Sequence, residues 1–336
     1  MRIPWRAVVG VGISALLLWW VLRGQDLGAI ARLVAGAKPM YLIACSVTLT
    51  SGGLIRALRW RLLLAPLATT SLNARWKAVN IGFLVSNVLP ARLGEIARPL
   101  ALSRMERVPM SGALGTVAVE RLLDGIALPM LLVATLVAPD FPEGATILGR
   151  SIGYAAFIAG LYAGIVLAIV ALLLVWPNSI PGLARAIAAM LPSAAGAKLI
   201  QTSTSFLSGL AVLRQPIVLL RVLLWSLLLW LWMAAGFWLA FRAFDIPLGF
   251  TAAMFTQCVV SLFVAIPAGP GYIGTLQAGV AVGVHEVFGI PTEPTLALAV
   301  AYHLAGFIPI TLLGWGYAWA LGLRIQSMSL RVERKD

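Results

Sequence analysis

The sequence predicts an all-α, polytopic membrane protein with six full spans and two re-entrant helical hairpins in an inverted-repeat architecture. Composition is the first observation: 61% of the 336 residues are apolar and 11% are charged, a balance that excludes an ordinary soluble domain. The second is a series of apolar stretches long enough to cross about 30 Å of hydrocarbon. The third is a pair of segments rich in proline and glycine, at residues 86–95 and 266–274, which occupy corresponding places in the two halves.

Six apolar stretches have the length of a membrane-spanning helix, which needs about 20 residues. They cover residues 5–22, 39–55, 112–138, 152–176, 216–241 and 295–322. Two further apolar stretches, at about 77–103 and 250–290, contain the two breaks. Each is interpreted as a hairpin that enters and leaves the membrane on one side. Counting each as a single crossing gives eight spans, which stays an alternative.

The basic residues are distributed asymmetrically if the N-terminus is cytoplasmic. Of the 25 Lys and Arg residues, five are then placed outside: Arg23, Arg32, Lys38, Arg150 and Arg242. Cytoplasmic loops of membrane proteins carry such an excess of basic residues. We therefore expect both termini to be cytoplasmic, with a short tail at 331–336, in a bacterial cytoplasmic membrane. A cleaved signal peptide is the alternative interpretation of the first apolar run.

Each half of this layout has the order span, span, hairpin, span. The first repeat covers residues 1–144 and the second covers residues 145–330. Because each half crosses the membrane three times, the second starts on the opposite side, and the two hairpins enter from opposite sides. Paired breaks of this kind mark binding sites in transporters, since non-helical backbone at membrane depth must face protein or a wet cavity.

Basic residues lie before, within and after the first break. Arg56 and Arg59 are three residues apart near the end of the second span and can hold a phosphate together; a membrane anchor beside an interfacial Trp is the alternative. Arg92, Glu95 and Arg98 are spaced by three, so on a helix they share a face and can form alternating ion pairs.

Three more charged residues lie early in the next apolar stretch. Glu120 and Asp124 are four residues apart, and Arg121 is three residues before Asp124. Charges inside a membrane are costly, so these residues are functional candidates. A structural ion-pair network between the hairpin and its neighbour is the alternative, and both interpretations are compatible.

The second break is a run of helix-breaking residues. It contains Gly269, Pro270, Gly271 and Gly274, and an apparent helix with Gln277 follows. Glycine loops and helix N-termini present backbone amides that bind anions, so a phosphodiester can be bound there without a basic side chain. A simple breaker loop is the alternative.

Several kinds of site are missing from the sequence. It has no phosphate-binding GxxxxGK[ST] loop, no Cys/His metal spacing and no GxSxG nucleophile motif. We therefore expect no metal, no cofactor and no covalent chemistry. The net charge of +13 lies in short loops beside apolar spans, which predicts a membrane surface rather than nucleic acid as the partner.

Four motifs occur in order across most of the chain: Arg56-x-x-Arg59-Trp60-x-x-Leu63-Leu64, Asn87-x-Leu89-Pro90-x-Arg92-x-Gly94-Glu95-x-x-Arg98, Glu120-Arg121-x-x-Asp124 and Pro270-Gly271-x-x-Gly274. With them the chain resembles the lysylphosphatidylglycerol synthase transmembrane-region (UPF0104) family, also described as flippase-like membrane proteins. The family commonly has an acidic residue where this chain has Gln277. Larger relatives add a soluble aminoacyltransferase domain, which is absent from this sequence. The resemblance therefore implies lipid translocation rather than synthesis.

These observations predict a transporter that moves an anionic or phosphate-bearing lipid between leaflets, as a homo-oligomer or with a partner synthase or transferase. A membrane-embedded glycosyl- or phosphotransferase that uses a polyprenyl-phosphate carrier is the alternative, and a non-catalytic assembly subunit is a third. The candidate substrate-binding residues are Arg56, Arg59, Asn87, Arg92, Glu95, Arg98, Glu120, Arg121, Asp124, Gly269, Pro270, Gly271, Gly274 and Gln277.

Overall fold

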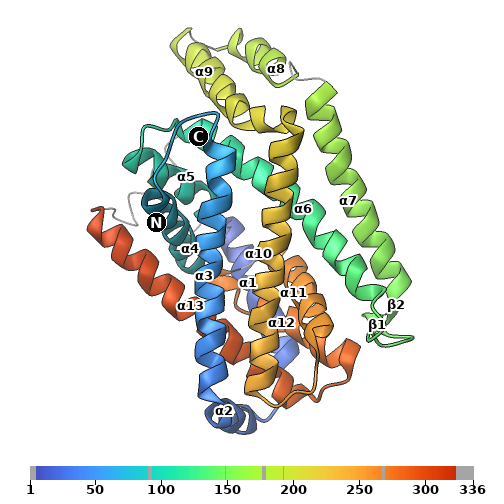
Figure 1. Cartoon of the computed structure of the whole chain (residues 1–336). Helices are drawn as coiled ribbons and strands as arrows, with labels where there is room; N and C mark the ends of the chain where they lie inside the picture. Colours follow the sequence, from blue (N-terminus) through green and yellow to red (C-terminus); the bar gives the residue numbers. More distant parts are fainter. Residues whose placement is uncertain are drawn as a thin grey trace.

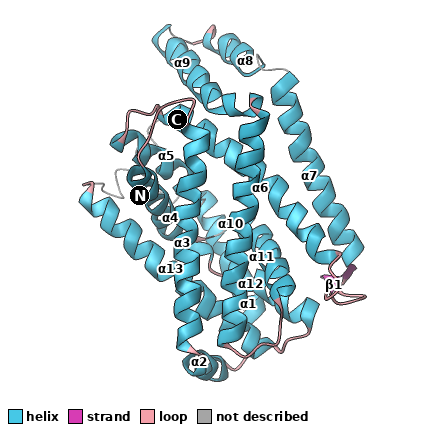
Figure 2. Cartoon of the chain, in the orientation of Figure 1, coloured by secondary structure: helices cyan, strands magenta, loops and turns pink. Residues whose placement is uncertain are grey.

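The computed structural model describes residues 5–89, 93–147, 149–175, 179–191, 193–266 and 269–322. These residues are almost entirely helical, which confirms the predicted all-α class (Figure 2). The strands of the described part, β1 (Thr146–Ile147) and β2 (Arg150–Ser151), pair as a short antiparallel hairpin. Arg92 and the neighbouring Pro90 and Ala91 lie outside the described residues, as do residues 267–268 in the second break.

The helices before the strands include two with side-chain caps. Asp26 accepts hydrogen bonds from the amides of Gly28 and Ala29 at the start of α2, and Ser71 accepts one from the amide of Ala74 in α4. The helices are α1 (Trp5–Leu22), α2 (Leu27–Gly36), α3 (Pro39–Leu64), α4 (Leu72–Val88), α5 (Gly94–Met105) and α6 (Met110–Leu136).

The helices after the strands include short irregular turns around the second break. They are α7 (Ile152–Val175), α8 (Ser179–Ala188), α9 (Ser193–Leu210), η1 (Ala211–Arg214), α10 (Pro216–Ala243), α11 (Phe250–Ala265), η2 (Pro270–Tyr272), α12 (Thr275–Val280), the π-helical turn η3 (Ala281–Glu286) and α13 (Thr292–Ala320).

All six predicted spans coincide with helices, namely α1, α3, α6, α7, α10 and α13. Within the described residues, α3, α10 and α13 are long and apolar enough to cross a membrane. The exact number of crossings stays a prediction. The shorter helices lie at the two ends of the molecule: α2 is at the lower end in Figure 1, and α8 and α9 are at the upper end.

The long helices α3 and α10 lie side by side at the centre of the molecule (Figure 1). Two glycines allow this close approach. A Cβ atom at Gly52 would lie 2.8 Å from Sδ of Met233, and one at Gly236 would lie 2.9 Å from Cδ2 of Leu49. Their contact joins the first half of the chain to the second.

The first break separates α4 from α5, which pack against each other. A Cβ atom at Gly94 would lie 2.0 Å from the carbonyl oxygen of Gly82 and 2.2 Å from Oγ of Ser86, so only glycine fits there. The outer ends of the two helices also lie together, because the amide and the hydroxyl of Ser71 donate to Oε1 of Glu106 at 3.1 and 2.9 Å. The α4–α5 segment therefore returns to the end where it started.

The second break follows α11, and α12 and η3 lead back along that helix. The described residues of its turn include three with positive φ: Gly271 at 68°, Tyr272 at 60° and Gly274 at 89°. Phe255 of α11 and Phe288, just beyond η3, have ring centroids 5.8 Å apart, so this segment also reverses direction. A Cβ atom at Gly271 would lie 3.4 Å from the carbonyl oxygen of Asn87 at the end of α4, so the two breaks are neighbours.

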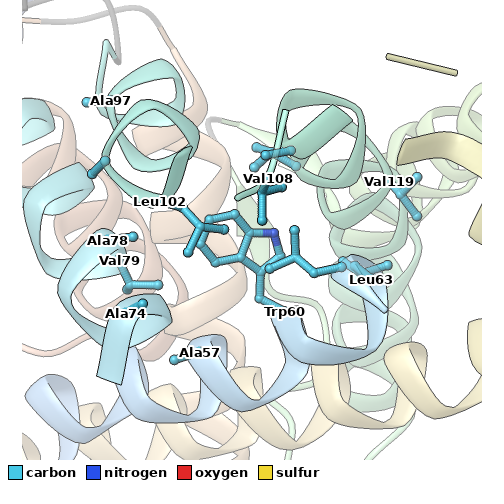
Figure 3. Packing of buried hydrophobic residues seen from close by; sticks show 14 of the residues in the cluster. Ala57, Trp60, Leu63, Ala74, Ala78, Val79, Ala97, Leu102, Val108 and Val119 are labelled. Atoms are coloured by element: carbon cyan, nitrogen blue, oxygen red, sulfur yellow. The ribbon is translucent and has the colours of Figure 1, made fainter. Parts of the chain in front are cut away.

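A buried apolar cluster around Trp60 joins α3, α4, α5 and α6 (Figure 3). The Trp60 side chain is fully buried, with Ala78 and Leu102 in the same cluster. Its indole Nε1 donates to Oγ1 of Thr116 on α6 at 2.8 Å, which satisfies the only polar atom of the side chain. This cluster fixes the relative positions of the helices that carry the charged residues described below.

Replacing Gly94 with alanine tests the α4–α5 contact. We expect Gly94→Ala to lower the free energy of unfolding by about 1–3 kcal/mol, because backbone atoms of α4 must shift to admit the Cβ atom. Thermal unfolding of the purified protein in detergent measures the change. Gly316→Ala is the matched control: nothing lies within 4 Å of a Cβ atom there, so stability should be unchanged or slightly higher. Equal unfolding temperatures for the two variants would contradict the contact.

Candidate functional site

Buried charged side chains from α3, α5 and α6 form one cluster. At its centre is Glu120, whose side chain is fully buried. Its Oε1 lies 2.9 Å from Nη2 of Arg59, 2.9 Å from Nη1 of Arg98 and 3.1 Å from Nη2 of Arg121. Nη1 of Arg56 lies 3.9 Å from the same oxygen. One carboxylate thus contacts four guanidinium groups that come from three helices.

Asp124 lies one helical turn after Glu120 and faces the same side of α6. Its Oδ1 accepts from Nη1 of Arg59 at 2.5 Å, and its Oδ2 lies 3.6 Å from Nη1 of Arg121. Arg121 also reaches Oε1 of Glu95 at 3.8 Å. Because the side chains of Arg121 and Glu95 are 38% and 39% exposed, this pair forms the rim of an otherwise buried site.

The pairing differs from the expectation that Arg92, Glu95 and Arg98 would form alternating ion pairs along one helix. Within the described residues, Glu95 pairs with Arg121 and Arg98 pairs with Glu120, both of which lie on α6. Because α5 packs against α6, the charged residues of α5 lie closer to partners on α6 than to each other. Arg92 lies outside the described residues.

Aromatic rings cover two of the arginines. The Arg98 guanidinium carbon lies 3.8 Å from the ring centroid of Trp60, and that of Arg56 lies 5.4 Å from Trp230 and 5.7 Å from Phe83. A cation over an aromatic face is stabilised by the ring quadrupole, by about 2 kcal/mol when both are desolvated. The rings therefore offset part of the cost of burying these charges.

Helix α10, from the second half of the chain, completes the cluster. Nη1 of Arg59 donates to Oγ of Ser226 at 2.5 Å, and the indole Nε1 of Trp230 donates to Oδ1 of Asp124 at 3.3 Å. Sequence reasoning missed both residues. Ser226 did leave a signal, since it is an isolated polar residue in a long apolar run.

The cluster has more positive than negative groups, and several of its donors lack acceptors. Among the described residues, four arginines face three carboxylates, counting Glu95 at the rim. Within the part of the chain that the structure describes, Nε of Arg59 and both Nε and Nη2 of Arg98 are buried without a hydrogen-bond partner, as is Oε2 of Glu120. Buried donors are normally satisfied, and each one left free costs about 1–3 kcal/mol. The arrangement is therefore suited to bind an anion.

Two backbone amides of the glycine turn at the second break are satisfied from within the chain. The Gly269 amide donates to Oγ of Ser14 on α1 at 2.8 Å, and the Gly274 amide donates to Oε1 of Gln277 at 2.8 Å. Nε2 of Gln277 is 3.0 Å from Nδ1 of His303 on α13. Two of the amides expected to bind a phosphate are thus occupied by side chains of the protein itself.

Asn87 and Pro270 lie where the two breaks approach each other. Nδ2 of Asn87 donates to Oγ1 of Thr311 on α13 at 2.8 Å, so this side chain links α4 to α13 rather than joining the charged cluster. Pro270 begins the η2 turn. Among the described residues, no group of three or more His, Cys, Asp or Glu side chains is placed to hold a metal ion.

Residues 7–314 match the lysylphosphatidylglycerol synthase TM region. The chain belongs to this family. It is 26% identical over 316 residues to a UPF0104 membrane protein of Methanothermobacter thermautotrophicus, an alignment that covers 90% of this chain and 88% of the relative. A UPF0104 membrane protein of Methanocaldococcus jannaschii is 27% identical over 115 residues, which cover 33% of this chain and 34% of that relative. No solved structure matches.

Family membership confirms the resemblance inferred from the sequence motifs. Together with the long apolar helices, it identifies the chain as a multi-pass membrane protein. The match includes all the charged residues of the cluster, from Arg56 to Asp124, as well as the α10 residues that complete it.

Removing the central carboxylate tests how far the cluster depends on it. We expect Glu120→Gln to lower the free energy of unfolding by about 3–5 kcal/mol, because it leaves buried arginines without their shared counter-charge. Thermal unfolding in detergent measures the change. Glu106→Gln removes a carboxylate that accepts neutral hydrogen bonds from Ser71, and it should cost about 0.5–1.5 kcal/mol. If both variants lose the same stability, Glu120 has no special role.

Proposed function

We propose that this protein moves a phosphate-bearing lipid between the two leaflets and binds its headgroup phosphate at the arginine cluster. The observation that carries the proposal is the free edge of Arg98, whose Nε and Nη2 groups are buried and have no partner among the described residues. These two groups lie on one side of the planar guanidinium. They match two oxygens of a phosphate, the bidentate geometry in which arginine binds best.

The carboxylates hold the arginines in place and keep the binding reversible. Glu120 and Asp124 occupy other edges of the same guanidinium groups that a phosphate would contact. A transported lipid must leave as readily as it enters, and carboxylates that compete for the arginines lower the affinity for phosphate. The rim formed by Glu95 and Arg121 is the exposed edge of the site, so we place the entry of the headgroup there.

The proposal includes six spans, two re-entrant hairpins and inverted repeats at residues 1–144 and 145–330. Two contacts favour this architecture over the alternative with eight spans: the one between Ser71 and Glu106, and the one between Phe255 and Phe288. Each joins the two ends of one hairpin, as a re-entrant segment requires. We further propose that the protein lies in a bacterial cytoplasmic membrane. The distribution of basic residues supports placing both termini in the cytoplasm.

The pairing of the carboxylates with arginines supports translocation in place of covalent chemistry. A transferase that uses a polyprenyl-phosphate carrier needs a carboxylate free to act as a base or to hold a metal. Asp124 has both oxygens within 3.6 Å of arginine nitrogens, and Glu95 is paired with Arg121. Carboxylates held in this way are suited to position arginines.

Replacing Arg98 tests the proposed function. In proteoliposomes of phosphatidylethanolamine and phosphatidylglycerol, we expect the wild-type chain to speed the movement of fluorescent phosphatidylglycerol between leaflets. Arg98→Gln should slow that movement by about tenfold or more, since hydrogen bonds to a charged group contribute about 1.5–3 kcal/mol. Accessibility of the fluorophore to a membrane-impermeant quencher gives the rate.

Arg75→Gln is the matched control. Arg75 is also buried, but it donates to the carbonyl oxygens of Ala57 and Thr70 and lies outside the cluster. Its replacement should leave the rate per folded protein unchanged. Equal rates for Arg98→Gln and the wild type, or no acceleration by the wild type, would overturn the proposal. A metal-dependent transfer product in the same vesicles would favour the transferase.

A further inference from the structure

Tyr272, in the turn of the second break, has an unusual backbone conformation for its residue type. Its φ is 60°, in the left-handed region that favours glycine. The other non-glycine residue with positive φ among the described residues is Asp245, and aspartate is tolerated there because its short side chain can hydrogen-bond locally. A bulky aromatic side chain has no such compensation. The backbone strain at Tyr272 therefore points to a function for its side chain.

The contacts of the turn hold this backbone conformation in place. The amides of Gly269 and Gly274 are bound by side chains, as described above. The carbonyl oxygen of Tyr272 itself accepts a hydrogen bond from Oγ1 of Thr275 at 3.0 Å. These contacts fix the turn and so set the direction of the Tyr272 side chain.

The hydroxyl of Tyr272 has no hydrogen-bond partner among the described residues. Two other tyrosines near the second half of the bundle do have one: the hydroxyl of Tyr302 donates to Oε1 of Gln257 at 3.4 Å, and that of Tyr317 accepts from Nε1 of Trp76 at 2.9 Å. Tyr272 is half-buried, and its oxygen is not one of the fully enclosed atoms that lack a partner in the described part. A ligand can therefore reach this hydroxyl.

The turn of the second break and the start of α5 both rest on the end of α4. A Cβ atom at Gly271 would lie 3.4 Å from the carbonyl oxygen of Asn87, and Gly94 packs directly against Ser86. Asn87 and Ser86 are consecutive residues. The residues that follow the two glycines, Tyr272 in the turn and Glu95 on α5, are therefore brought to the same region.

Glu95 forms the exposed rim of the arginine cluster with Arg121, at 3.8 Å. The phenol of Tyr272 lies close enough to the Arg121 guanidinium for the two to interact electrostatically. Tyr272 thus faces the rim from the second half of the chain, whereas the rim residues come from the first half. It is uncharged, so it adds a hydrogen-bond donor to the site without adding another buried charge.

We infer that the Tyr272 hydroxyl binds the lipid headgroup at the rim, where it donates a hydrogen bond to an oxygen of the phosphate. This inference rests on the proposed function, because the ligand is the same phosphate-bearing lipid. It adds a group from the second hairpin to a site whose charges all come from the first half. The headgroup is then held between the two hairpins, with arginines on one side and the tyrosine on the other.

Tyr272→Phe tests this contact, because it removes the hydroxyl and keeps the ring. The unfolding temperature in detergent should be unchanged. In the vesicles described above, the variant should slow the movement of fluorescent phosphatidylglycerol about tenfold, the lower end of the effect of losing a hydrogen bond to a charged group. Tyr317→Phe is the matched control: the hydroxyl of Tyr317 is bound to Trp76, away from the rim, so the rate per folded protein should equal that of the wild type.

Nitration by tetranitromethane separates contact with the lipid from a structural role. The full chain in dodecyl maltoside is nitrated with and without phosphatidylglycerol, and mass spectrometry of the peptides locates the nitrated tyrosines. The lipid should suppress nitration of Tyr272 and leave Tyr154, which is 49% exposed on α7, unaffected. In Arg98→Gln, which binds the phosphate weakly, this protection of Tyr272 should be lost.

The outcomes for Tyr272 and for the proposed function are distinct. If Tyr272→Phe moves phosphatidylglycerol at the wild-type rate, or if the lipid does not protect Tyr272 in the wild type, the role of Tyr272 is overturned. A slow Arg98→Gln variant would then still support the proposed function. If the wild-type chain itself does not speed the lipid, both proposals fail.

Discussion

The contact between the Glu120 carboxylate and the surrounding guanidinium groups is the constraint on which the arrangement of this protein depends. Burying an unpaired charge costs several kcal/mol, and a single carboxylate can offset that cost only if the arginines converge on it. Arg59 comes from α3, Arg98 from α5 and Arg121 from α6 itself. The three helices must therefore hold fixed positions relative to one another. The apolar cluster around Trp60, the contact between Gly82 and Gly94, and the aromatic rings over Arg56 and Arg98 all help to fix these positions.

The same cluster does not satisfy all of its own buried donors. In the described part of the chain the arginines of the cluster exceed its carboxylates, and the Nε and Nη2 groups of Arg98 have no acceptor there. A network built only to join helices would be more stable with its donors satisfied. The excess of positive charge is what led us to propose a ligand that supplies negative charge for part of the time. A lipid phosphate carries that charge.

The sequence predicted the helices, and it marked several of the charged residues that the structure brings together, for one physical reason. Charges inside apolar runs are costly, so Arg59, Arg98, Glu120 and Asp124 were conspicuous, and the breaks were marked by residues that cannot continue a helix. The partners of these charged residues were not predictable, because the spacing of residues along one helix does not show which helix packs against it. Ser226 and Trp230 were missed for that reason, as was the use of Ser14 and Gln277 to satisfy the glycine turn.

The contribution of α10 to the cluster has a consequence for biosynthesis. All the charged members lie between Arg56 and Asp124, but Trp230 follows Asp124 by 106 residues. At ribosomal speeds of about 5–20 residues per second, the nascent chain carries its charges for roughly 5 to 20 seconds before the last polar partner emerges. Over that interval the insertion machinery or its water must shield Arg59 and Asp124, so the first half of this protein is not a finished unit when it leaves the ribosome.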